Sequence, residues 1–223
     1  MTSKPQPGAE AVIKPPLFPK KMVARGLPDG TLSDHEQYSQ LTLSQELWMG
    51  QAIDYLSFEQ VMFRTVNMNS TSFTHLQLNS VRLNECDLAN ARWPEALWHR
   101  VEAIECRMTG FLGIEAKFQD MLFKQCKANL AHFRFSTFKA VRFEECDLSD
   151  ADFQGADLTG VSFVHCNLQN VEMSGAKLMG ADLRGCTIDG LRAGPQELRG
   201  AIVDTGQALA LVQAFGIVVK PTE

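Results

Sequence analysis

The sequence predicts an all-β solenoid in which each coil has four short sides. An apolar residue recurs at every fifth position from Leu56 onward, and a second apolar residue follows it two positions later. Six cysteines are spaced by 20 residues each time. A helix would place apolar residues three and four apart and a flat strand would place them two apart, so neither explains a spacing of two and then three. The pattern instead indicates a chain that turns a corner at every fifth residue.

The two apolar rows define what points inward. Of the 27 residues in the first row, from Leu56 to Cys186, 25 are apolar, and most of them are small. The second row starts at Phe58 and consists mainly of phenylalanine, leucine and methionine, with two tryptophans. Residues two apart in an extended chain point the same way. We therefore expect one small and one large side chain of each repeat in the core.

Glycine marks the expected corners. In the C-terminal part of the pattern it occupies one outward position, two residues after the large inward residue, as Gly155, Gly160, Gly175, Gly180, Gly185 and Gly190. Glycine tolerates the backbone angles that a tight turn can require. A turn is therefore predicted at this position of each repeat.

The cysteines predict the number of sides. All six lie in the small inward row: Cys86, Cys106, Cys126, Cys146, Cys166 and Cys186. Because 20 residues are four repeats, a four-sided coil stacks them in one column. Residues 56 to 190 then make about seven coils, and the rod is about 32 Å long at roughly 4.8 Å for each coil.

Two interpretations of this column were weighed, a redox or metal-binding stack and a column of small apolar fillers. Parallel side chains do not present the dihedral angle of a disulfide. The inward rows contain no histidine or carboxylate that would complete a zinc site. We interpret the cysteines as fillers, and we predict neither a metal nor a cofactor.

Composition divides the chain into four parts. Residues 1–28 form a proline-rich arm with a charge of +4, and the remaining residues carry −9. Residues 29–55 are expected to be an entry segment, residues 56–203 the coil, and residues 204–223 a cap. A net-negative body argues against direct binding of nucleic acid. The chain lacks a membrane-length apolar run and a signal-type N-terminus, so a cytoplasmic location is expected.

The C-terminal part predicts a short capping helix. Asp204 or Thr205 can serve as its N-cap, residues 207–215 suit a helix, and Gly216 suits the position after it. One face carries Leu209, Val212 and Phe215, which are predicted to cap the rod or to join two rods in a homodimer. Residues 217–219 are predicted to form a closing strand.

Two outward features are candidate binding surfaces. The first is acidic: Glu85, Glu105 and Glu145 share a corner, and Glu102 and Glu144 lie beside it. The alternative to a binding surface is an acidic face that is exposed to solvent and binds no partner. The second is an apolar contact patch, made of Leu112, Ile114, Leu130 and Phe135. Patches of this kind usually have a cover or a partner, and the arm is predicted to cover it through residues 12–13 and 17–18.

The residues also carry a family resemblance. The stretches CDLAN (86–90), CDLSD (146–150), ADLTG (156–160) and ADLRG (181–185) resemble the A(D/N)Lxx signature of pentapeptide-repeat proteins. The resemblance implies a right-handed quadrilateral β-helix. The C-terminal stretch GAIVDTGQALALVQAFGIVV resembles the C-terminal module of bacterial members of the family, including fluoroquinolone-resistance proteins that dimerise there.

No motif of an enzyme is present: the sequence has no phosphate-binding loop, no zinc-protease motif and no nucleophile elbow. A non-catalytic binding protein is therefore expected. The resemblance implies a DNA mimic that engages a type II topoisomerase, DNA gyrase or topoisomerase IV, and modulates quinolone susceptibility. The alternative is a structural scaffold or adaptor for an unidentified protein partner.

Overall fold

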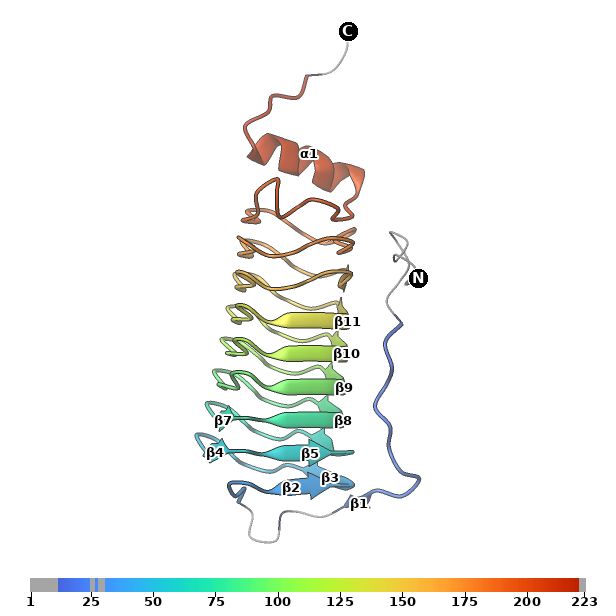
Figure 1. The fold of residues 1–223 in the computed structure, drawn as a ribbon, viewed down its shortest axis with the longest axis vertical. Helices are drawn as coiled ribbons and strands as arrows, with labels where there is room; N and C mark the ends of the chain where they lie inside the picture. The colour runs from blue at the N-terminus through green and yellow to red at the C-terminus, as the bar shows by residue number, and fades with distance from the viewer. Residues whose placement is uncertain (1–11, 25–26, 28–30, 221–223) are drawn as a thin grey trace, which may run out of the picture.

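The structure is a computed structural model, and it describes residues 12–24, 27 and 31–220. Within these residues the chain forms a rod of stacked coils (Figure 1). Residues 20 apart pair in parallel, so that Phe118 lies between Trp98 on one coil and Phe138 on the next. The predicted all-β solenoid with 20 residues per coil is confirmed.

The strands are short at both ends of the rod and longest in its middle. They are β1 (Val23–Ala24), β2 (Gln37–Ser39), β3 (Leu41–Ser44), β4 (Ala52–Asp54), β5 (Ser57–Glu59), β6 (Met62–Arg64), β7 (Ser72–Thr74), β8 (Gln77–Asn84), β9 (Leu97–Ile104), β10 (Lys117–Lys124), β11 (Thr137–Glu144) and β12 (Ser162–Val164). Each strand from β8 to β11 covers two sides of its coil. Single bridges such as Asp87↔Arg107 hold the other two sides.

The four sides are named here from one coil. Side A is residues 116–120, side B is 121–125, side C is 126–130 and side D is 131–135, and each side recurs every 20 residues. Strand β10 therefore runs over sides A and B.

Every corner has the same backbone conformation. The φ angle is positive at every fifth residue from His35 to Gly190, between 51° and 72°. Glycine suits this left-handed region, yet most corner residues carry a side chain. The coils hold them there through backbone bonds between neighbours, such as the one that the Glu105 N–H donates to the Lys124 carbonyl at 2.9 Å. The predicted turn is confirmed, and it does not depend on glycine.

The coil begins before the predicted start at residue 56. Strand β2 pairs with β5, and Tyr38 lies opposite Phe58. The first coil carries Glu36 and Gln51 at inward positions, where neither is buried. A terminal coil has a neighbour on one side only, so it tolerates polar residues that hide the repeat from sequence analysis. Much of the predicted entry segment is therefore coil.

Aromatic rings fill the core along the rod axis. Phe123 stacks on Phe143 with ring centroids 4.6 Å apart, and Phe143 stacks on Phe163 at 5.1 Å. At one repeat the large and small positions are exchanged, since Phe111 takes the small place and Gly113 the large one. A Cβ at residue 113 would lie 2.7 Å from the Phe111 ring, so the exchange conserves the packed volume.

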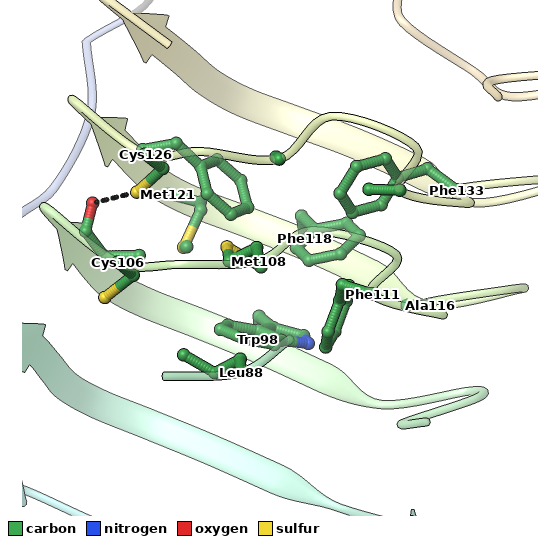
Figure 2. Packing of buried hydrophobic residues seen from close by; sticks show 14 of the residues in the cluster. Leu88, Trp98, Cys106, Met108, Phe111, Ala116, Phe118, Met121, Cys126 and Phe133 are labelled. Atoms are coloured by element: carbon green, nitrogen blue, oxygen red, sulfur yellow. Dashed lines mark hydrogen bonds between the residues drawn. The ribbon is translucent and has the colours of Figure 1, made fainter. Parts of the chain in front are cut away.

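The six cysteines are free thiols in one buried column. Figure 2 shows Cys106 and Cys126 one above the other. Each thiol donates to a backbone carbonyl: Cys106 to Leu83 at 3.6 Å, and Cys126 to Ala103 at 3.3 Å. The column is therefore tied to the coil by hydrogen bonds as well as by packing.

The C-terminal helix covers the last coil (Figure 1). Helix α1 (Thr205–Ala214) begins after Asp204, which forms a capping box with Gln207. Gly216 follows with φ at 78°. The predicted helix is confirmed, but residues 217–219 form no strand and are exposed. No helix in the described part of the chain is long and apolar enough to cross a membrane.

Candidate interaction surfaces

The candidate surfaces lie on the outside of the rod, because hydrophobic side chains fill its interior. Among residues 12–24, 27 and 31–220, no group of three or more His, Cys, Asp or Glu side chains could hold a metal ion. Outward residues that are 20 apart stack into columns along the axis. The chemistry of each side is therefore the chemistry of its columns.

The corner between sides B and C carries the predicted glutamate row, Glu85, Glu105 and Glu145, each with φ near 53°. Glu85 accepts a hydrogen bond from the Asn84 amide at 3.2 Å, and Glu145 accepts one from the Gln125 amide at 2.8 Å. Amides are neutral, so these contacts leave the carboxylate charges in place. The row is a negative edge on the rod.

The other two predicted acidic residues, Glu102 and Glu144, are neutralised on side B. Glu102 lies 2.6 Å from an Arg82 nitrogen, and Glu144 lies 2.7 Å from the Lys124 amine. The hydrogen bond to Glu144 raises the pKa of Lys124. The structure therefore divides the predicted acidic surface into a charged corner and a paired side.

Opposite charges one coil apart recur on the other sides. The pairs are Asp87–Arg107 at 2.5 Å, Asp157–Lys177 at 3.6 Å and Glu172–Arg192 at 3.4 Å. Exposed pairs contribute about 0–1 kcal/mol each to stability. They also place positive and negative side chains next to each other on sides C, A and D.

The predicted apolar patch is on side D. Leu112 pairs with His132 of the next coil, and Leu130 and Phe135 occupy the two corners that flank His132. Leu130 is 52% exposed and Phe135 is 58% exposed, whereas Leu112 and Ile114 are half-buried. These four residues are named the side D patch.

The described part of the N-terminal arm, residues 12–24, does not cover the side D patch, so the prediction made for residues 12–13 and 17–18 is wrong. The arm runs beside side B (Figure 1). The Lys14 backbone N–H donates to Asp120 Oδ1 at 3.2 Å, and the Phe18 ring lies 5.6 Å from the Arg82 guanidinium. Asp120 and Arg82 offer the arm a carboxylate and a cation, which the apolar patch lacks.

The C-terminal helix contacts the coil through residues other than the three predicted. The buried Gln207 amide donates to the Leu183 carbonyl at 2.6 Å and to the Cys186 carbonyl at 2.8 Å. Leu211 packs against the core. Leu209 is 45% and Phe215 is 42% exposed, and Val212 is half-buried. The predicted set thus lies mostly at the free end of the rod.

Sequence analysis missed a ring stack at the corner between sides D and A. Tyr55 stacks on His75 with centroids 4.1 Å apart and on His35 at 4.9 Å. Asp54 lies 2.8 Å from His75 Nδ1. Hydrogen bonds from Thr74 and His75 lower the pKa of Asp54. The signal was in the sequence, because the three rings are 20 residues apart.

Comparison with known proteins agrees with this geometry. Residues 146–185 match the family model of pentapeptide repeats in eight copies. Residues 146–185 therefore carry pentapeptide repeats, and the five-residue period continues from that segment to the start of the coil. An uncharacterized protein of Bacillus subtilis (strain 168), YisX, is 27% identical over 90 residues, which are 40% of this chain and 42% of that protein. The chain thus aligns with less than half the length of this relative.

Two solved structures are among those that match the chain. A trypsin-treated variant of QnrB1, a plasmid-mediated fluoroquinolone resistance protein, covers 83% of this chain and 100% of its own, with 18% identity and a TM-score of 0.35. HetL, a pentapeptide-repeat protein involved in heterocyst differentiation regulation from the cyanobacterium Nostoc sp. strain PCC 7120, covers 70% of this chain and 90% of its own. Its identity is 16% and its TM-score 0.24.

Proposed function

We propose that the chain is a non-catalytic scaffold that binds a protein partner through the side D patch. The observation that carries this proposal is the exposure of two large apolar side chains, Leu130 and Phe135, at the two corners of side D. Exposed apolar patches on folded proteins mark interaction sites. On side D, bridges such as Leu112↔His132 join neighbouring coils and fix the spacing of the patch residues along the rod.

Affinity capture from the source cells tests the proposal. Wild-type chain is compared with a Leu112→Ser/Phe135→Ser variant and with Leu47→Ser. Leu47 is the matched control, because it is 70% exposed on side C, away from the patch. We expect one protein to be retained by wild type and by Leu47→Ser, and to be lost from the double variant. Retention of the captured protein by the wild type and by both variants would contradict the proposal.

A second candidate function is binding of a type II topoisomerase as a DNA mimic that modulates quinolone susceptibility. The observation that favours it is the row of Glu85, Glu105 and Glu145, whose hydrogen-bonding partners are neutral. A supercoiling assay with DNA gyrase and a quinolone tests it. We expect Glu105→Gln/Glu145→Gln to weaken any effect of the protein on gyrase, and absence of an effect at micromolar protein would remove this candidate.

We further propose a homodimer formed through the free end of the rod. Leu209, Phe215 and Val218 are exposed there, and Val218 is 78% exposed. Sedimentation equilibrium of wild type and Leu209→Glu/Phe215→Glu tests this proposal. A dimer that survives the substitution would contradict it.

A cytoplasmic location is proposed as well. Six free cysteines in one chain are typical of a reducing compartment. Fractionation of the source cells with antibody to the chain tests the location, and recovery outside the cytoplasm would contradict it.

A further inference from the structure

The arm rests on side B with few directional contacts. Its end nearest the coil, β1, pairs with Leu41 and Thr42 of β3. Farther along, Phe18 lies by Arg82, and the Lys14 N–H reaches Asp120. None of residues 12–23 is buried. Residues 12–23 therefore lie on the surface of the rod outside its core, whereas Leu27 at the end of the arm is buried in the core.

The arm has the pattern of a polyproline II helix. The half-buried residues Ile13, Pro16, Pro19 and Met22 recur every third position, and Phe18 is the one addition. A polyproline II helix has about three residues per turn and makes no internal hydrogen bonds, so one edge faces its support. This is how proline-rich ligands lie on the domains that bind them.

Side B offers such a segment a specific surface. Ile13 and Pro15 line a hollow together with Glu102, Leu122 and Glu144. Leu122 gives the hollow an apolar wall, and the ion-paired Glu102 and Glu144 form its polar rim together with Arg142. At its edge Asp120 is 5% exposed, and its carboxylate accepts a hydrogen bond from the arm backbone.

The charges of arm and rod are complementary. Residues 12–24 contain Lys14, Lys20 and Lys21 and no acidic residue, whereas the rod has an acidic excess and carries the glutamate row beside side B. Attraction of this kind sets which partners approach a surface more than it sets how tightly they bind. Side B together with the adjoining glutamate row therefore fits an extended segment with prolines and lysines.

We propose that side B, from Arg82 to Glu144, is a binding surface for an extended, proline-rich, lysine-bearing segment of a partner protein. Residues 12–24 occupy this surface in cis until such a segment displaces them. The inference rests on the proposed role as a binding protein, but it concerns a surface separate from the side D patch.

The test uses the full chain and a labelled synthetic peptide of residues 12–24 as the probe. A release variant, Ile13→Ser/Phe18→Ser, loosens the arm and leaves the rod unchanged. A tethered arm competes at a millimolar effective concentration, so we expect the peptide to bind the release variant about tenfold or more tightly than wild type. Fluorescence anisotropy gives both affinities, and circular dichroism confirms that the variants fold.

Leu122→Ser and Leu112→Ser, each in the release variant, form a matched pair. Both leucines are half-buried outward residues, and Leu122 alone of the two lines the hollow under the arm. We expect Leu122→Ser to weaken peptide binding about fivefold or more and Leu112→Ser to leave it unchanged. A peptide of the same composition in scrambled order should bind weakly.

The proposal is overturned if the peptide does not bind the release variant. It is also overturned if wild type binds equally well, if the scrambled peptide binds equally well, or if the two leucine variants behave alike. Failure here is distinguishable from failure of the scaffold proposal, because capture through the side D patch is read with Phe135 and does not involve Leu122.

Discussion

The Gln207 side chain joins the C-terminal helix to the coil, since its amide nitrogen lies 2.6 Å from the Leu183 carbonyl oxygen. The same nitrogen donates to the Cys186 carbonyl at 2.8 Å. The Leu183 carbonyl also accepts from the Cys186 N–H at 3.1 Å. Within the coil the equivalent Cys106 carbonyl accepts from the Lys127 N–H of the next coil, and an unpaired buried carbonyl is costly. One glutamine thus supplies what the next coil would have supplied.

Replacing Gln207 should therefore destabilise the end of the rod. Gln207→Ala removes both hydrogen bonds and half of the capping box, with an expected loss of about 1–3 kcal/mol in the free energy of unfolding. Denaturant unfolding followed by circular dichroism measures it. Gln213→Ala on the exposed end of the helix is the control. Equal stability of the two variants would contradict this role.

The Asp204 carboxylate should make the attachment of the helix dependent on pH. Hydrogen bonds from the backbone N–H groups of Gln207 and Gly185 lower the pKa of Asp204 from its ordinary value of 3.8. A lowered pKa in the folded state means that the stabilisation is present above about pH 4 and is lost as the pH falls through the folded value. Thermal melts of wild type and Asp204→Asn should differ at about pH 6 and converge as the pH falls through the lowered folded-state pKa of Asp204. A difference that is independent of pH would show that the charge plays no part.

Two corner glycines should respond differently to alanine. Both residues have positive φ, so Gly160→Ala should cost about 1 kcal/mol from backbone strain alone. At residue 155 a Cβ would also lie 2.6 Å from the Phe135 ring. Gly155→Ala should therefore destabilise the rod more than Gly160→Ala does. Combining Gly155→Ala with Phe135→Ala should remove this additional loss of stability. Equal melting temperatures for the two alanine variants would contradict this packing.

The cysteine column should be unreactive while the chain is folded. Each of the six cysteines is at most 7% exposed, so a reagent in solution does not reach its sulfur. At Cys166, hydrogen bonding to Cys146 also raises the pKa to about 12. The thiolate is the reactive form, so a disulfide reagent at about pH 8 should label no cysteine of the native chain and all 6 after denaturation. Rapid labelling without denaturant would refute the buried column.

The coil could be predicted from the sequence because each inward position is decided locally. A residue such as Phe118 or Val141 is apolar because its own place in the repeat is buried. The same spacing recurs in many repeats, so it can be recognised in the sequence. The place of the arm could not be predicted, since it depends on contacts between residues far apart, such as Phe18 and Arg82. The first coil was hidden by polar residues that only a terminal coil tolerates.

The candidate surfaces were predicted less completely than the coil. The outward direction of Glu102 and Phe135 follows from the period, but the ion pair of Glu102 with Arg82 depends on side-chain conformation. In the same way, the hydrophobic pattern of the C-terminal helix did not show that a buried glutamine, rather than Val212, would make the contact with the coil.

Site-specific photo-crosslinking tests the central claim, binding of a partner through the side D patch, most directly. A photoreactive phenylalanine is placed at position 135, or at position 47 as the exposed control on side C, in the full chain within its source cells. Binding through the patch predicts one crosslinked protein from position 135 and none from position 47. Crosslinks of equal yield from both positions, or none from position 135 while capture succeeds, would contradict it.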